Sequence, residues 1–198
     1  MNTRLGACLA LLNKLNFFWK KSNCPPRFKL NVFDAVIRSK LVYSLESVNL
    51  TPALVSKLNA VQYRGLRKIL GIEHTYINRS NTNVRIIQQA NQILNPHNKP
   101  NRSIRLFGDY VHTRQEALLK HTVRASGLDP LREAMLRYNS PTPLQPATRR
   151  VGRPKTLWAH AVYERIWTKS GLGDANGFVA NTDSCIRQLG EAISIRSI

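Results

Sequence analysis

The segment from Thr51 to Gly71, TPALVSKLNAVQYRGLRKILG, carries the start, stop and periodicity signals of one α-helix. Thr51 can cap the first turn, Pro52 suits the first helical position, and Gly71 suits the position after the last turn. Apolar residues recur at helical spacing and fall on one broad face: Leu54, Leu58, Val61, Leu66, Ile69 and Leu70. The segment therefore predicts a long amphipathic helix with one face packed into a core.

The opposite face of this predicted helix is cationic, and the segment contains no acid; the nearest acids are Glu46 and Glu73. A solvated helix face usually mixes both signs of charge, because oppositely charged residues four apart attract each other. A face of one sign repels itself unless an anion lies along it, which indicates a polyanionic partner. We expect four cations on this face to contact nucleic-acid phosphates: Lys57, Arg64, Arg67 and Lys68.

Net charge supports a polyanionic partner. The 198 residues carry 30 basic and 11 acidic side chains, a net of +19, and 42% of them are hydrophobic, enough for a core. Residues 1–100 hold 15 basic and 3 acidic residues, and residues 101–198 hold 15 basic and 8 acidic residues. The first half therefore carries the larger net positive charge, and we expect it to contribute more to binding a polyanion. No apolar run is long enough for a transmembrane helix, so we expect no membrane partner. Three widely spaced cysteines favour reduced thiols in a nuclear or cytoplasmic setting.

The rest of the chain predicts further helices and almost no strand, so we expect an all-α fold. A helical bundle is expected over residues 1–94, a linker over 95–102, and a second, looser helical region over 103–198. The helix expected over 27–46 is apolar on most sides, which predicts that it is buried at the centre. The other expected helices lie at 3–20, 82–94, 103–125 (as one helix or two), 130–138, from 156 onward, and 183–193.

The segment 140–155 contains four prolines, which exclude a helix, and is strongly basic. Its Gly152-Arg153-Pro154 core, flanked by bases, partly resembles the AT-hook, in which an extended backbone lays arginine into a narrow minor groove. Val151 stands where the AT-hook has a second core arginine. Minor-groove binding, general phosphate contact and an idle basic linker all stay open. The cations expected to make such contacts are Arg149, Arg150, Arg153 and Lys155. Elsewhere in the chain, Arg38 and Lys40 are weaker candidates for phosphate contact.

Motifs for catalysis and metal binding are missing from the sequence. It has no closely spaced pair of aspartates for two metal ions, no HExxH, no zinc-site spacing of His and Cys, no glycine-rich phosphate loop and no G-x-S-x-G. We therefore expect no catalytic residue, no metal site and no cofactor. Six aromatic residues could stack on unpaired bases, but their helical spacing favours core packing: Phe17, Phe18, Trp19, Trp158, Tyr163 and Trp167.

Four blocks of sequence resemble, in order, the region after the palm in reverse transcriptases of non-LTR (LINE-type) retrotransposons. The first runs from Val36 to Glu46, VIRSKLVYSLE, and the second ends in RGLRKILG at Gly71. The third runs from Arg105-Leu106-Phe107-Gly108 to Arg124, and the fourth is Arg150 to Pro154 with Trp158. Together they span roughly residues 28–167. Two positions depart from the family pattern: Ser44 replaces the usual Gly, and Asp109 stands where a His is common.

The resemblance implies that residues 1–94 correspond to the thumb, a helical bundle that packs on the template–primer duplex. Residues 103–198 would then be the downstream region that holds template RNA or target DNA. The fingers and the palm, with its metal-binding aspartates, are absent. The resemblance thus implies a nucleic-acid-binding fragment, remnant or truncated product of an RNA-directed DNA polymerase. It would have no polymerase activity of its own, and its partners would be an RNA–DNA hybrid or duplex DNA and a separate palm and fingers.

Other interpretations remain open at the level of the sequence. The chain is also compatible with a decayed transposon product without selected function, or with a helical interaction module whose basic face meets an acidic protein. A third possibility is attachment of residues 3–21 to a membrane surface, because Lys14, Lys20 and Lys21 lie beside apolar residues. A helix that packs into a core shows the same pattern.

Overall fold

The computed structural model describes residues 2–97, 103–138, 140–144 and 158–194, and within these residues the fold is all-α, as predicted. The β-type pairing in these residues is an isolated antiparallel bridge between Leu136 and Pro143. In chain order the helices are α1 (Asn2–Lys14), α2 (Asn16–Lys21), α3 (Pro26–Phe33), the π-helix η1 (Asp34–Arg38), α4 (Ser39–Val42), α5 (Pro52–Leu70), α6 (Asn83–Leu94), α7 (Phe107–Arg124), α8 (Pro130–Met135), α9 (Trp158–Lys169), α10 (Ala175–Ala180) and α11 (Thr182–Ser194).

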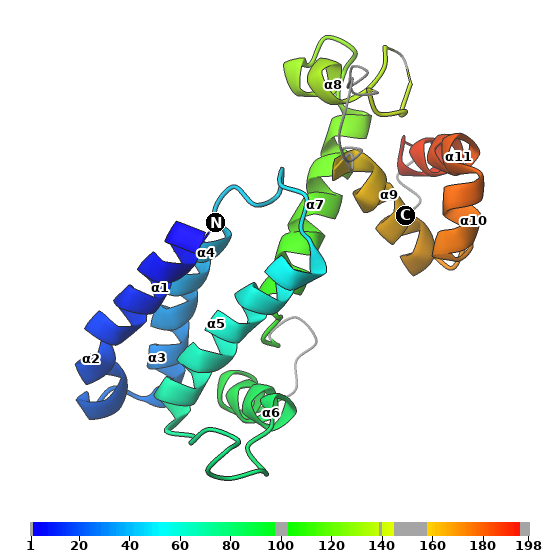
Figure 1. Cartoon of the computed structure of the whole chain (residues 1–198). Coiled ribbons are helices and arrows are strands. Elements are labelled where there is room, and N and C mark those ends of the chain that lie inside the picture. The colour runs from blue at the N-terminus through cyan, green and yellow to red at the C-terminus, as the bar shows by residue number, and fades with distance from the viewer. Residues whose placement is uncertain (1, 98–102, 139, 145–157, 195–198) are drawn as a thin grey trace. The chain divides into compact units, whose positions relative to one another are not determined.

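The chain divides into two compact units (Figure 1). Unit 1 comprises residues 1–43 and 50–110, and unit 2 comprises residues 44–49 and 111–198. The division thus falls inside α7, after Tyr110, and differs from the predicted linker at 95–102. The sequence marks that linker by its polar and proline-rich composition, whereas the first turn of α7 is fixed to unit 1 by contacts that composition does not reveal.

Helix α5 forms as its sequence signals predict. The hydroxyl of Thr51 accepts a hydrogen bond from the Leu54 amide at 3.3 Å, and Pro52 opens the first turn. Gly71 ends the helix in the left-handed conformation, with φ of 67°, where a side chain would be strained. The buried face includes Leu58, Val61 and other residues toward the C-terminal end. The predicted helix is therefore confirmed, with its core-facing side.

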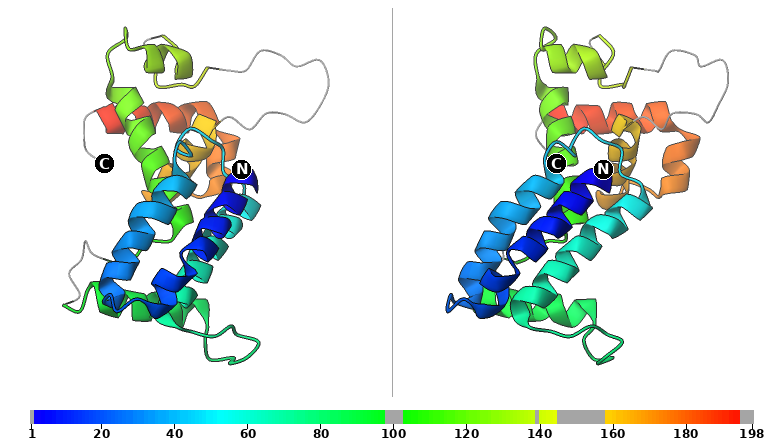
Figure 2. Two further views of the ribbon diagram at one scale, coloured as in Figure 1. Left: turned by 90° about the vertical axis from the view of Figure 1, so that its left-hand side faces the viewer. Right: turned by 60° about the vertical axis from the view of Figure 1, so that its left-hand side comes forward.

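Helices α1, α2, α3 and α6 pack against α5 in unit 1, and α4 packs against α1 (Figures 1 and 2). Gly65 lets α3 come close, since a Cβ there would lie 2.1 Å from the Phe33 ring. The Gln62 side chain accepts a hydrogen bond from the Phe107 amide at 2.8 Å and donates one to the Arg105 carbonyl at 2.9 Å. Asn59 Oδ1 accepts from the Gly108 amide at 2.9 Å. Side chains of α5 thus hold the first turn of α7.

The predicted helices of unit 1 differ from the observed ones in two places. The segment expected as one helix over 3–20 bends at Leu15 into α1 and α2, and the indole of the buried Trp19 donates to the Leu12 carbonyl at 3.1 Å across the bend. The segment 27–46 forms α3, η1 and α4, and the prediction that it is buried on most sides is wrong. Phe28 is 51% exposed and Tyr43 is 74% exposed, whereas Leu30, Phe33, Ile37 and Leu41 are buried.

Unit 2 has its own apolar core, built by α7, α9, α10 and α11 with Leu136. Val162 and Ile166 of α9 lie in this core, as their spacing predicts, while α10 has no clear signal in the sequence. The hydroxyl of Tyr163 donates to the Pro141 carbonyl at 2.8 Å, which ties the described residues 140–144 to α9. Helix α8 begins behind an Asp129 cap, within the predicted 130–138. The predicted N-terminal cap of α9 at Thr156 lies outside the described residues.

Candidate nucleic-acid interface

Three of the four predicted phosphate-contacting residues on α5 lie at the surface of unit 1. Lys57 and Arg64 are exposed, Lys68 is half-buried, and they span about 16 Å along the helix at 1.5 Å per residue. The side chains of Lys57 and Arg64 have no hydrogen-bond or ion-pair partner within the described part of the chain. We call Lys57, Arg64 and Lys68 the α5 stripe. Its members present positive charge that the folded unit leaves available to a ligand.

Arg67 does not belong to this stripe, and the prediction that it shares the exposed face is wrong. Its side chain is 8% exposed and its guanidinium points into the protein. Nη1 donates to the Glu73 carbonyl at 2.9 Å, and Nη2 donates to the Asn81 carbonyl at 3.0 Å and to Asn83 Oδ1 at 3.1 Å. Arg67 lies about one-sixth of a turn from Arg64 around the helix, and this offset turns it toward the loop after α5. It therefore braces that loop.

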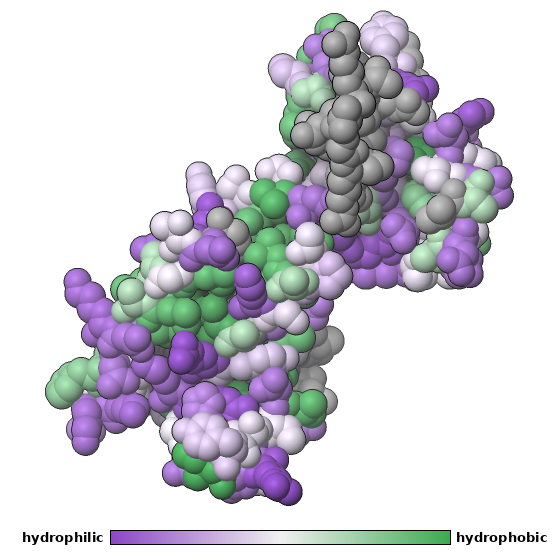
Figure 3. Space-filling model, viewed as in Figure 1, coloured by the Kyte–Doolittle hydropathy of each residue, from purple (hydrophilic) through white to green (hydrophobic). Residues whose placement is uncertain are grey.

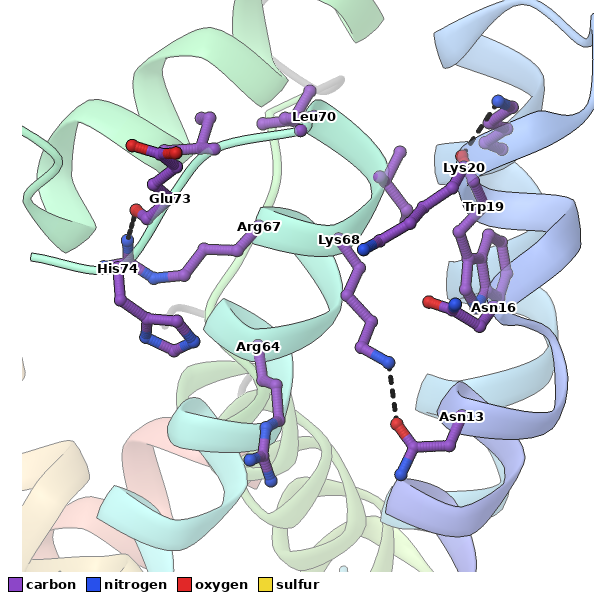
Figure 4. Close-up of a pocket in the computed structure, with 14 residues that line it drawn as sticks. Asn13, Asn16, Trp19, Lys20, Arg64, Arg67, Lys68, Leu70, Glu73 and His74 are labelled. Carbon is purple, nitrogen blue, oxygen red and sulfur yellow. Dashed lines mark hydrogen bonds between the residues drawn. The ribbon is translucent and has the colours of Figure 1, made fainter. Parts of the chain in front are cut away.

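A cleft opens where α2 meets the C-terminal end of α5, with a volume of about 1000 Å³ (Figure 4). We call it the basic cleft. Of the residues that line it, five are cationic and one is acidic: Lys20, Lys29, Arg64, Arg67 and Lys68 against Glu73. In Figure 4 the side chain of Lys20 extends from α2 toward the end of α5 that carries Lys68, and the Glu73 carboxylate lies on the far side. Mostly hydrophilic side chains cover this part of unit 1 in Figure 3.

The charge of Lys68 shows how the cations of the cleft affect one another. Partial burial lowers the pKa of the Lys68 ammonium, and repulsion from Lys20 and Arg64 lowers it further. Its one hydrogen bond, from Nζ to Asn13 Oδ1 at 2.7 Å, goes to a neutral acceptor. Lys20 and Arg64 are thus close enough to repel Lys68, and an anion bound among the three cations would offset this repulsion.

Lys29 adds positive charge beneath the cleft. Its side chain is 7% exposed, and Nζ donates to the carbonyl oxygens of Trp19 at 2.9 Å and Ser22 at 3.0 Å. These carbonyls belong to the last turn and the end of α2, where a cation is favourable. The described contacts of Lys29 are therefore with carbonyl oxygens, which hold the ammonium in place without an acidic partner.

The loop between α5 and α6 supplies an aromatic edge to the cleft. His74 lines the cleft, and its ring stacks on Tyr76 with 5.7 Å between centroids and 21° between planes. Tyr76 is 83% exposed, so one face of its ring is open to a ligand. Sequence reasoning missed Lys20, His74 and Tyr76 as site residues. The sequence carries little signal for these residues, because helical periodicity relates residues within one helix. It does not show which loop or which other helix lies beside that helix in space.

The other predicted sites have mixed outcomes. Arg149, Arg150, Arg153 and Lys155 lie outside the described residues. Arg38, a weaker candidate of the sequence, is engaged within unit 1: it pairs with Asp34 at 2.6 Å, and its guanidinium lies 4.3 Å from the centroid of the Tyr110 ring. Burial raises the pKa of the Asp34 carboxyl, and Arg38 opposes that rise. The other weaker candidate, Lys40, is exposed.

The aromatic side chains largely follow the prediction of core packing. Trp19, Tyr163 and Trp167 are buried, and Phe18 and Trp158 are half-buried. Phe17 is the exception, with 76% of its side chain exposed on α2.

The described residues also bear on other classes of site. They contain no group of three or more His, Cys, Asp or Glu residues placed to hold a metal ion. None of the helices in the described ranges has the length and apolar character needed to cross a bilayer.

Comparison of the chain with protein-family models, with curated proteins and with solved structures finds no match.

Proposed function

We propose that unit 1 binds the phosphate backbone of nucleic acid through the α5 stripe. The observation that carries this proposal is that Lys57, Arg64 and Lys68 follow one helix without an acid among them. Lys20 and Lys29 add further positive charge to the basic cleft that Arg64 and Lys68 line. The stripe is long enough to follow a few consecutive phosphates of one strand. Contacts of this kind supply affinity and salt dependence but no sequence recognition.

We further propose that the chain is the thumb-like and downstream part of a LINE-type reverse transcriptase, which holds primer–template or target DNA and does not extend it. The backbone at Ser44 supports this assignment. Ser44 has φ of 57°, a left-handed conformation, and it stands at the position where the resembling family has glycine. Glycine adopts this conformation without strain, so the family residue fits the backbone that this chain forms. Gly71, the last residue of the second block, is left-handed too.

The test is a binding panel at about 150 mM salt, where weak non-specific contacts are already reduced. An RNA–DNA hybrid, duplex DNA and an acidic peptide of equal charge are titrated against the whole chain and against the Arg64→Gln/Lys68→Gln variant. We expect tighter binding to the nucleic acids than to the peptide, and a loss of that binding in the variant.

Each of the other outcomes contradicts the proposal in its own way. Tighter binding to the acidic peptide would assign the stripe to a protein partner. Equal and feeble binding to all three ligands would favour a decayed product without selected function.

A further inference from the structure

The basic cleft and the rings of His74 and Tyr76 beside it combine positive charge with an aromatic surface. The α5 stripe alone supplies only the positive charge. The cleft offers the cations Lys20, Arg64 and Lys68, which attract a phosphate, and the amides of Asn13 and Asn16, which can bind polar atoms. The exposed ring of Tyr76, stacked on His74 at its edge, offers a flat apolar surface. A ligand that satisfies both carries phosphate and an aromatic ring, as a nucleotide does.

We propose that the basic cleft binds an unpaired nucleotide at the end of a strand, with its phosphate among Lys20, Arg64 and Lys68 and its base stacked on Tyr76. This proposal rests on the proposed function and names the part of the nucleic acid that this cleft takes. A paired base inside a duplex is already stacked on both faces and cannot reach the Tyr76 ring. A base that extends beyond the last pair has a free face, and stacking on an exposed aromatic ring is favourable for every base.

The hydrogen bonds of the loop explain how Tyr76 is held next to the cleft. Arg67 donates to the carbonyls of Glu73 and Asn81, and the Asn81 side chain donates to the Glu73 carbonyl at 3.2 Å. These bonds close the loop at both ends onto α5, with His74 and Tyr76 between them. Arg67 is thus a positioning residue for the stacking surface, while Arg64 and Lys68 of the same helix contact the ligand.

The experiment compares three duplexes of equal length: one blunt, one with a two-nucleotide 3′ extension, and one with a two-nucleotide 5′ extension. The extensions carry 2-aminopurine, whose fluorescence falls when it stacks. We expect one or both extended duplexes to bind about 5- to 100-fold more tightly than the blunt one, which is the range that base–aromatic stacking supplies. Binding should quench the 2-aminopurine.

The variants separate stacking from charge. Tyr76→Ala should abolish the preference and the quenching, and Tyr76→Phe should keep both, because phenylalanine retains the flat ring. Tyr138→Ala is the matched control, since Tyr138 is 82% exposed in unit 2 and should have no effect. Lys20→Gln should weaken binding of the extended duplexes more than that of the blunt one.

The outcomes distinguish this proposal from the proposed function. Equal binding of all three duplexes, with blunt-duplex affinity still lowered by Arg64→Gln/Lys68→Gln, would overturn the strand-end site and leave the α5 stripe in place. Failure of that double variant to lower blunt-duplex affinity would instead contradict the proposed function. Free AMP should bind more weakly than an extended duplex, because it lacks the neighbouring phosphates. Equal binding of AMP would assign the cleft to free nucleotides and overturn the strand-end proposal.

Discussion

The two units of the chain use their cations in different ways. In unit 2, Lys169 pairs with Glu116 at 2.6 Å, Arg114 pairs with Glu46 at 3.4 Å, and Arg165 donates to Gln115 Oε1 at 3.1 Å. In unit 1 the α5 stripe and the basic cleft bring cations together that repel one another. The difference shows that net charge alone does not locate a binding surface. The informative cations are those that the fold brings close to one another without an acidic partner.

Arg67 sharpens this comparison, because it is a cation of unit 1 that behaves like those of unit 2. We predict that Arg67→Met lowers the stability of unit 1 by about 3 kcal/mol, since it removes three hydrogen bonds and leaves the carbonyl oxygen of the buried Asn81 without its arginine donor. Arg64→Met, its matched control on the same helix, should change stability by less than about 0.5 kcal/mol. Amide hydrogen exchange in α5 and α6 reports unit 1 by itself. Equal losses of stability from Arg67→Met and Arg64→Met would contradict the structural role that we assign to Arg67 alone.

Arg132 is the corresponding test in unit 2. Its guanidinium donates to the Thr122 and Val123 carbonyls in the last turn of α7. The helix dipole also stabilises a cation at this end of a helix. We predict that Arg132→Met destabilises unit 2 by about 1–2 kcal/mol. The salt dependence of nucleic-acid binding should stay the same. Hydrogen exchange at the end of α7 and a salt titration of binding check the two halves of this prediction, and a change of salt dependence without loss of stability would contradict it.

The smallest expected effect belongs to the ion pair between Lys169 and Glu116. Lys169 is 56% exposed and Glu116 is 15% exposed, so water screens the attraction from one side. A double-mutant cycle with Lys169→Met and Glu116→Gln should give a coupling free energy of about 0.5 kcal/mol. A coupling above about 2 kcal/mol would show that unit 2 depends on its ion pairs far more than the exposure of Lys169 indicates.

Local signals predict α5 well because each of them acts within a few residues. Thr51, Pro52 and Gly71 fix the two ends, and the apolar spacing fixes the buried face. The same holds for α6, where Thr82 caps the first turn by accepting from the Arg85 amide. The bend at Leu15 and the π-helix Asp34–Arg38 have no such signal. They follow from packing against neighbours that are distant in the sequence, and periodicity cannot report this.

The candidate site follows the same rule: the sequence predicts the site residues that share one face of one helix and misses those that other elements contribute. Helical spacing finds Lys57, Arg64 and Lys68, because all three lie on one face of one element. It misplaces Arg67, since an offset of a fraction of a turn decides whether a long side chain reaches solvent or the loop that follows. It misses Lys20, which α2 brings to the cleft, and Tyr76, which stacks on the cleft residue His74 in the loop after α5.

The slope of log affinity against log salt concentration for duplex binding tests the central claim most directly. In the Lys57→Gln/Arg64→Gln/Lys68→Gln variant we predict that the slope falls in magnitude by about 3, at roughly 0.9 for each phosphate that the variant no longer neutralises. The control replaces three exposed arginines outside the stripe, Arg27, Arg137 and Arg187, with Gln, removes the same charge and should leave the slope unchanged. An unchanged slope in the stripe variant, or an equal fall in the control, would contradict the assignment of the α5 stripe to the nucleic-acid backbone.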